Sequence, residues 1–205
     1  YRRIMGKYMF YSGSAAVIGC IGGYIIGIIL FPLVIWKCYG LMYDISGFKF
    51  QTSCNTKQMF DYCTNLIYNK SGNAYYLGNS SNPYVVLVKA INRSITSCKI
   101  NSNTKVISYR AFADCFELKS IEIPDSVVTI CEYAFDLCYE IESVKIGNGV
   151  ETIAVAAFMQ CCSLDILNLG SNVKNIGNSA FYACSIDNVT LPNGLKSIGS
   201  SAFYG

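Results

Sequence analysis

The sequence predicts an α/β, β-rich solenoid built from stacked repeats of 23 residues. The segment Ala-Phe-x-x-Cys occurs four times, and its phenylalanines are 23 residues apart at Phe112, Phe135, Phe158 and Phe181. Phe203 follows after 22 residues, in a fifth Ala-Phe pair. A fixed period of about 20 to 30 residues indicates supersecondary units, each of which buries its apolar face only against its neighbours.

Each repeat carries the same series of apolar positions. The first complete copy reads LKSIEIPDSVVTICEYAFDLC, from Leu118 to Cys138. Its L-x-x-I-x-I segment alternates with a period of two, which is typical of a half-buried strand, and Pro124 ends it. Val127 and Ile130 then begin a return leg, and Ala-Phe-x-x-Cys forms a turn or a short helix with Phe inside. Parallel strands lie about 4.8 Å apart, so about five repeats predict a leucine-rich-repeat horseshoe with a sheet roughly 20 to 24 Å long.

At these positions the chain resembles the BspA-like leucine-rich repeat family. The shared pattern is L-x-x-I-x-I-P-x-S-V-x-x-I-x-x-x-A-F-x-x-C, and the resemblance covers residues 91–205. It implies a surface-exposed or secreted repeat domain that serves in adhesion. Residues 73–90, NAYYLGNSSNPYVVLVKA, resemble the hairpin that often precedes such repeats.

A β-hairpin is also indicated by the residues themselves. Residues 74–77 and 84–91 are rich in β-forming side chains and flank the turn sequence Gly-Asn-Ser-Ser-Asn-Pro. The first repeat of a solenoid needs a cover for its apolar face. We therefore expect residues 73–94 to form an N-terminal cap on the repeats at 95–205.

The segment at residues 14–36 is long and apolar. No charged residue lies between Lys7 and Lys37. At 1.5 Å per residue, this segment would span roughly 35 Å, which exceeds the hydrocarbon core of about 30 Å. Aromatic residues flank both ends, as they do at membrane interfaces. The sequence predicts a transmembrane signal anchor here, preceded by a short basic segment at residues 1–13.

Three alternatives stay open for residues 14–36: a cleaved signal peptide, a lipid-modified Cys20 and a buried soluble helix.

Three basic residues precede the segment, at Arg2, Arg3 and Lys7, and two follow it. This bias favours a cytoplasmic N-terminus. The chain would then be a single-pass protein of the cell membrane, in contact with the lipid bilayer through residues 14–36, with extracellular repeats.

Residues 37–72 form a juxtamembrane segment, in which the pattern allows either a small subdomain or a short amphipathic helix at 55–68. Cys54 and Cys63 are the candidate disulfide pair in an oxidising compartment. The chain has 11 cysteines, an odd number, so at least one thiol would stay free.

Composition argues against several functions. The chain has no histidine, which removes Ser-His-Asp and Cys-His nucleophilic sites and histidine metal ligands. The repeat cysteines share one core column, where a free Cys behaves as a small hydrophobe; they are Cys115, Cys138, Cys161 and Cys184. Residues 95–205 carry seven basic and 11 acidic groups, which is unlike a nucleic-acid-binding surface. We expect no enzymatic activity, no cofactor and no metal.

The exposed strand positions are one candidate binding face, because horseshoes bind along their concave sheet. Lys99, Glu122 and Lys145 alternate in sign along one ladder, and Lys119 and Glu142 do so along the next. Such ladders are self-complementary. These residues are therefore expected to pair with one another, leaving partner contacts elsewhere.

Aromatic side chains near the turns are the second candidate. Phe116, Tyr139 and Tyr182 all lie in or near an Ala-Phe-x-x-Cys turn. If exposed, they would form an apolar patch along one edge, of the kind that marks an interaction site. Ordinary packing within the turns is the alternative.

These observations favour a membrane-anchored surface protein whose repeats act as a binding or adhesion module for protein or host-surface ligands. Two alternatives stay open: a structural spacer that displays a missing C-terminal domain, and the accessory repeat region of an enzyme whose catalytic domain lies elsewhere. The chain stops one residue before the next expected Cys, so we expect a fragment of a longer protein.

Overall fold

The structure is a computed structural model that describes residues 68–78 and 81–205. These residues belong to one compact unit. The expected anchor at 14–36, the basic segment before it, residues 37–67 of the juxtamembrane segment and the Cys54–Cys63 pair lie outside the described residues. Within the described part of the chain, no helix has the length and apolarity needed to cross a bilayer.

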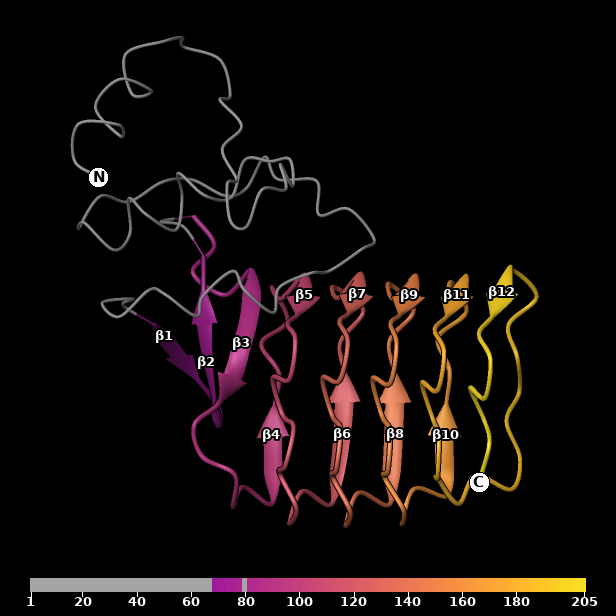
Figure 1. Cartoon of the computed structure of the whole chain (residues 1–205). Coiled ribbons are helices and arrows are strands. Elements are labelled where there is room, and N and C mark those ends of the chain that lie inside the picture. Colours follow the sequence, from indigo (N-terminus) through magenta and orange to yellow (C-terminus); the bar gives the residue numbers. More distant parts are fainter. Residues whose placement is uncertain (1–67, 79–80) are drawn as a thin grey trace, which may run out of the picture. The chain divides into compact units, whose positions relative to one another are not determined.

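The repeats form a β-solenoid in which each coil except the last contributes one strand to each of two sheets, and the last coil contributes one strand to the second sheet (Figure 1). The first sheet is wholly parallel and contains β4 (Ser97–Lys99), β6 (Ser120–Ile123), β8 (Ser143–Ile146) and β10 (Ile166–Asn168). The return legs form the parallel part of the second sheet, with β5 (Val106–Ile107), β7 (Thr129–Ile130), β9 (Thr152–Ile153), β11 (Asn175–Ile176) and β12 (Ser197–Ile198).

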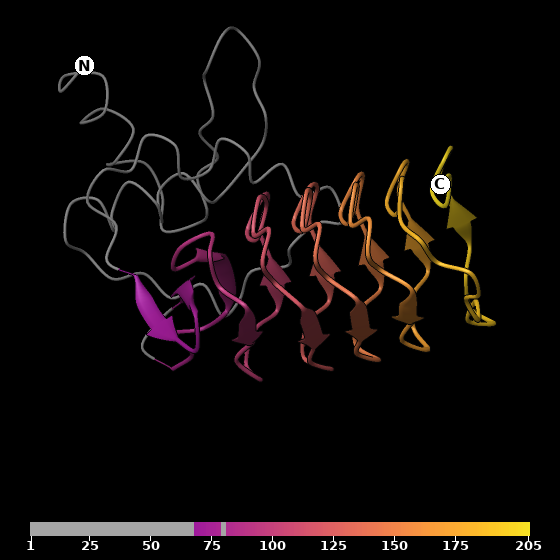
Figure 2. The ribbon, with the colours of Figure 1, turned by 90° about the horizontal axis from the view of Figure 1, so that it is seen from below.

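Three earlier strands continue the second sheet, namely β1 (Asn69–Ser71), β2 (Ala74–Leu77) and β3 (Val86–Ala90). β2 pairs antiparallel with both β1 and β3. β3 then pairs in parallel with β5, so this meander lies directly beside the first coil (Figure 2). Its Tyr76 is fully buried, and burial raises the pKa of this phenol to about 12.

The Ala-Phe-x-x-Cys segments are turns, and the described residues contain no helix. The residue before each Cys has a positive φ, which a right-handed helix does not allow; these residues are Asp114, Leu137, Gln160 and Ala183. The α component of the expected class is therefore missing from the described repeats. The β-solenoid and its 23-residue spacing are confirmed.

The core is a column of stacked phenylalanines. The ring centroids of Phe135 and Phe158 are 4.7 Å apart, with an interplanar angle of 2°. Phe112 stacks on one side of this pair and Phe181 on the other, at 4.9 and 5.2 Å. All four side chains are buried, as the repeat predicted.

The cysteine column adds a hydrogen bond to each coil. The thiol of Cys138 donates to the backbone carbonyl of Phe112, with Sγ and O 3.2 Å apart. The thiols of Cys161 and Cys184 make the same bond, at the same distance, to Phe135 and Phe158. A cysteine therefore fills the core and also serves a buried carbonyl of the preceding coil, which an aliphatic side chain of this size would not do.

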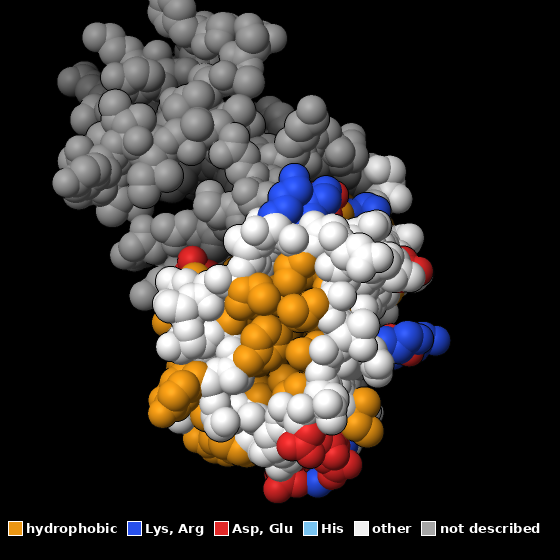
Figure 3. All heavy atoms as spheres, turned by 90° about the vertical axis from the view of Figure 1, so that its right-hand side faces the viewer, with side chains coloured by type: hydrophobic (Ala, Val, Ile, Leu, Met, Phe, Trp, Pro, Cys, Tyr) orange, Lys and Arg blue, Asp and Glu red, His pale blue; other side chains and the backbone are white. Residues whose placement is uncertain are grey.

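Burial weakens toward the last coil. Apolar side chains gather on its outer face (Figure 3). Leu191 and Ile198 are exposed by 42% and 45%, and Phe203 is half-buried.

The prediction of a fifth strand in the first sheet is wrong: among the described residues, this sheet has four strands and ends at β10. Residues 186–191 carry the apolar pattern of a strand but pair with nothing in the described sheet. This repeat has one residue fewer after Cys184 than the others. We attribute the lost pairing to that deletion, because a shorter connection changes where the following segment can lie against β10.

Candidate functional site

Phe116 and Tyr139 form an exposed aromatic pair on the turn side of the solenoid. Their side chains are exposed by 43% and 42%. The rings stack with their centroids 5.5 Å apart and an interplanar angle of 13°. We call these two residues the aromatic ridge. An interaction patch at these turns requires exposed aromatic side chains, and both Phe116 and Tyr139 are exposed.

Tyr182 does not join the aromatic ridge. It is half-buried and stacks on Tyr204, with the ring centroids 5.5 Å apart. Tyr182 directly follows the Phe of its repeat, whereas Phe116 and Tyr139 directly follow the Cys. The predicted patch of three residues is therefore two separate aromatic pairs. The different positions of these residues within their repeats are the sequence signal for this separation.

The strand face carries ion pairs between neighbouring coils. Nζ of Lys145 is 2.6 Å from Oε1 of Glu122, and Lys99 lies opposite Glu122 in the register of the sheet. The hydrogen bond to Glu122 raises the pKa of Lys145. Both side chains are well exposed, so solvent screens this pair and its contribution to stability is small.

One predicted pair is wrong: Lys119 bonds to Glu140 rather than to Glu142. The hydrogen bond to Glu140 raises the pKa of Lys119. Both glutamates precede β8, and the alternation of side chains alone does not say which one a long lysine side chain reaches. Lys119 is in either case paired with a glutamate of the neighbouring coil, as the predicted ladder required, and is not left for a partner protein.

A buried ionic cluster, which sequence reasoning missed, lies under the turns of the first coils. Asp114 accepts a hydrogen bond from Arg110 at 3.0 Å and forms an ion pair with Arg93 at 3.1 Å, and Arg110 also lies 3.5 Å from Asp136. Both carboxylates are almost fully buried. Desolvation raises the pKa of Asp136, and the neighbouring Arg110 opposes that shift. Since each acid faces an arginine, the cluster is best explained as a connection between coils.

The buried thiols are unsuited to nucleophilic chemistry. Burial raises the pKa of Cys98 to about 11 and that of Cys115 to about 12, and it also raises the pKa of Cys161. The reactive form of a cysteine is the thiolate, which these groups do not supply at neutral pH. Cys162, by contrast, is an exposed free thiol. No group of three or more potential metal ligands occurs within the described ranges.

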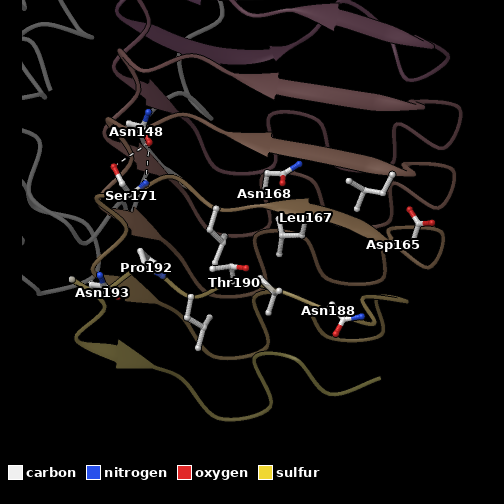
Figure 4. Close-up of a pocket in the computed structure, with 14 residues that line it drawn as sticks. Asn148, Asp165, Leu167, Asn168, Ser171, Asn188, Thr190, Pro192 and Asn193 are labelled. Atoms are coloured by element: carbon white, nitrogen blue, oxygen red, sulfur yellow. Dashed lines mark hydrogen bonds between the residues drawn. The ribbon is translucent and has the colours of Figure 1, made fainter.

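A cleft of about 880 Å³ opens beside β10, where the fifth strand was expected (Figure 4). One wall is residues 165–169 and the other is residues 188–194. Asn148 and Ser171 lie at one end, where the Asn148 side chain accepts from the backbone N–H and the hydroxyl of Ser171 at 3.0 and 3.1 Å. The length change after Cys184 is the only sequence signal that could have indicated this cleft.

The geometry defines a class of protein: a parallel β-solenoid scaffold with an exposed aromatic ridge and a surface cleft. The pattern of the BspA type leucine-rich repeat region matches six copies over residues 91–205. The chain belongs to the family of proteins with BspA-type leucine-rich repeats. Such repeat proteins are generally surface modules for protein interaction and generally lack catalytic activity.

Two bacterial leucine-rich repeat proteins of known structure are similar to this chain. The T. pallidum leucine-rich repeat protein TpLRR is 27% identical with a TM-score of 0.56, and the match covers 58% of each chain. A leucine-rich repeat protein from Bacteroides ovatus is 27% identical with a TM-score of 0.51, over 67% of this chain and 36% of the other. This chain therefore matches little more than half the length of the first and about a third of the second. Comparison with curated proteins gives no match.

Proposed function

We propose that this chain is a membrane-anchored surface protein whose repeats bind a protein or host-surface ligand, as an adhesion module does. Residues 14–36 would anchor it in the lipid bilayer, with the N-terminus in the cytoplasm and the repeats outside the cell. The meander β1–β3 would cover the first coil. The charge bias around residues 14–36 and the surface role that is general in the family support this arrangement.

The aromatic ridge is the observation that carries the binding function. Phe116 and Tyr139 expose about two fifths of their surface on a backbone fixed by the stacked coils. Large aromatic side chains on a rigid scaffold lose little conformational entropy on binding, and they are enriched among the residues that dominate interface energies. The strand face offers less, because Lys145 with Glu122 and Lys119 with Glu140 are already paired.

Replacing both ridge residues by serine is expected to weaken binding about tenfold or more, since hot-spot side chains of this kind contribute about 2 kcal/mol or more. The assay is binding of the purified chain to a panel of immobilised host extracellular-matrix proteins. The comparison variants are Lys99→Glu with Glu122→Lys on the strand face, and Tyr182→Ser with Tyr204→Ser at the other stacked pair. An unchanged midpoint of urea unfolding shows that each variant is folded. A larger loss from the charge reversal than from the ridge variant would move the site to the strand face.

A further inference from the structure

The first sheet ends at a backbone edge that no described strand covers. In the earlier coils, a row of hydrogen bonds crosses the sheet: Lys119 N–H donates to Thr96 O, Glu142 N–H to Lys119 O, and Asp165 N–H to Glu142 O. Within the described chain, no backbone hydrogen bond continues this row from residues 185–194 to residues 162–169. The far edge of β10 therefore presents the backbone groups to which another strand would bond.

The two coils that flank the cleft are hydrogen-bonded to each other at the second sheet but not at the first. At the second sheet the last two coils are closed, because Lys196 N–H donates to Lys174 O at 2.7 Å and Gly199 N–H to Ile176 O at 2.8 Å. At the first sheet, the same two coils are separated by the cleft. The space is thus held open by a fixed connection at its back, and it runs along the free edge of β10 (Figure 4).

The side chains along the cleft suit an extended peptide. Ile166 on β10 is exposed by 55%, and Leu191 on the facing segment by 42%. Asn168 and Thr190 add an amide and a hydroxyl group to the lining of the cleft (Figure 4). A strand placed here would bury apolar surface and pair its backbone with β10, which is the mode of recognition by β-strand addition.

The charge of the cleft selects among peptides. Among the described residues that line the cleft, Asp165 is the only ionisable one, and Asp187 lies just before the facing wall in the sequence. No ion pair joins either aspartate to a basic group in the part of the chain that the structure describes. A basic side chain at this end of a bound peptide would therefore meet unpaired negative charge.

We propose that the cleft binds an extended segment of a partner protein, which adds a parallel strand to β10 and places a lysine or arginine near Asp165. A parallel orientation continues the direction of β4, β6, β8 and β10. The site lies outside the aromatic ridge and does not depend on it.

The test uses the full chain and fluorescein-labelled heptapeptides of alternating valine and threonine, with a lysine or a glutamate at the amino end. Fluorescence anisotropy is expected to show binding of the lysine peptide, weaker binding of the glutamate peptide, and none after N-methylation of alternate backbone amides. Asp165→Lys should weaken binding of the lysine peptide several-fold, because it replaces a weak, solvent-exposed attraction by a repulsion of similar size, and it should reverse the preference. Glu117→Lys makes the same charge change on an exposed residue away from the cleft and should leave both affinities unchanged.

Amide hydrogen exchange supplies the second readout. Residues 165–169 and 188–191 should gain protection only when the lysine peptide is present. Absence of peptide binding, equal affinity for both peptides, or binding that survives N-methylation would overturn the proposal. Protection of residues 188–191 without peptide would also overturn it, because the chain would then close the sheet itself. The ridge variant should bind the peptide normally, so failure at one site is distinguishable from failure at the other.

Discussion

Replacing Phe158 by alanine is expected to lower the free energy of unfolding by about 3 to 5 kcal/mol, through lost burial and the cavity left behind. Phe158 is fully buried, and its ring stacks on Phe135 at 4.7 Å and on Phe181 at 5.2 Å. Phe135→Ala should cost a similar amount, because its ring also has a neighbour on each side.

Phe203→Ala is the matched control, since this residue holds the same position in the last coil. Its ring is half-buried, and among the described residues it stacks only on Phe181. The loss there should be much smaller. Urea unfolding of the three variants measures the difference, and equal losses at Phe158 and Phe203 would refute the nearest-neighbour account of the coils.

A methyl group added at Gly149 should also destabilise the solenoid strongly. A Cβ at this position would lie 1.7 Å from the carbonyl oxygen of Asp125 in the preceding coil, and backbone atoms cannot move aside as a flexible side chain can. The coils would have to shift relative to each other. We expect Gly149→Ala to cost about 1 to 3 kcal/mol or more, the range for overpacking.

Gly194 offers the control for that substitution. It stands at the same position of its repeat, but a Cβ there would have no heavy atom within 4 Å. Gly194→Ala should therefore be close to neutral in the same unfolding experiment. If both alanine variants unfold at the wild-type midpoint, the close approach of the coils at Gly149 is wrong.

The parts of the fold that repeat with the period could be predicted from the sequence. Phe135 and Cys138 have the same surroundings as Phe158 and Cys161, so one pattern fixes all four. The strand and return-leg columns follow in the same way, because each coil is the template for the next.

The features that occur in one coil only, and so depart from the 23-residue period, could not be predicted from the repeat pattern. The cleft beside β10 depends on one missing residue after Cys184, whose effect is a matter of connection geometry rather than of pattern. The buried contacts of Asp114 depend on two arginines that occur in only one coil each. Tyr182 lies near a turn, as Phe116 and Tyr139 do, but it directly follows Phe181 rather than a Cys and therefore stacks on Tyr204 instead of joining the aromatic ridge.

The display of the repeats outside the cell is the central claim about function, and Cys162 gives the most direct test. This thiol is exposed, while Cys115 and Cys161 are buried. A membrane-impermeant maleimide applied to intact cells, after mild reduction, should label the chain at Cys162. Mass spectrometry should locate the label there, and the Cys162→Ser variant should lose it. Labelling of Cys162 only after the cells are lysed would place the repeats inside the cell and contradict the surface-binding function.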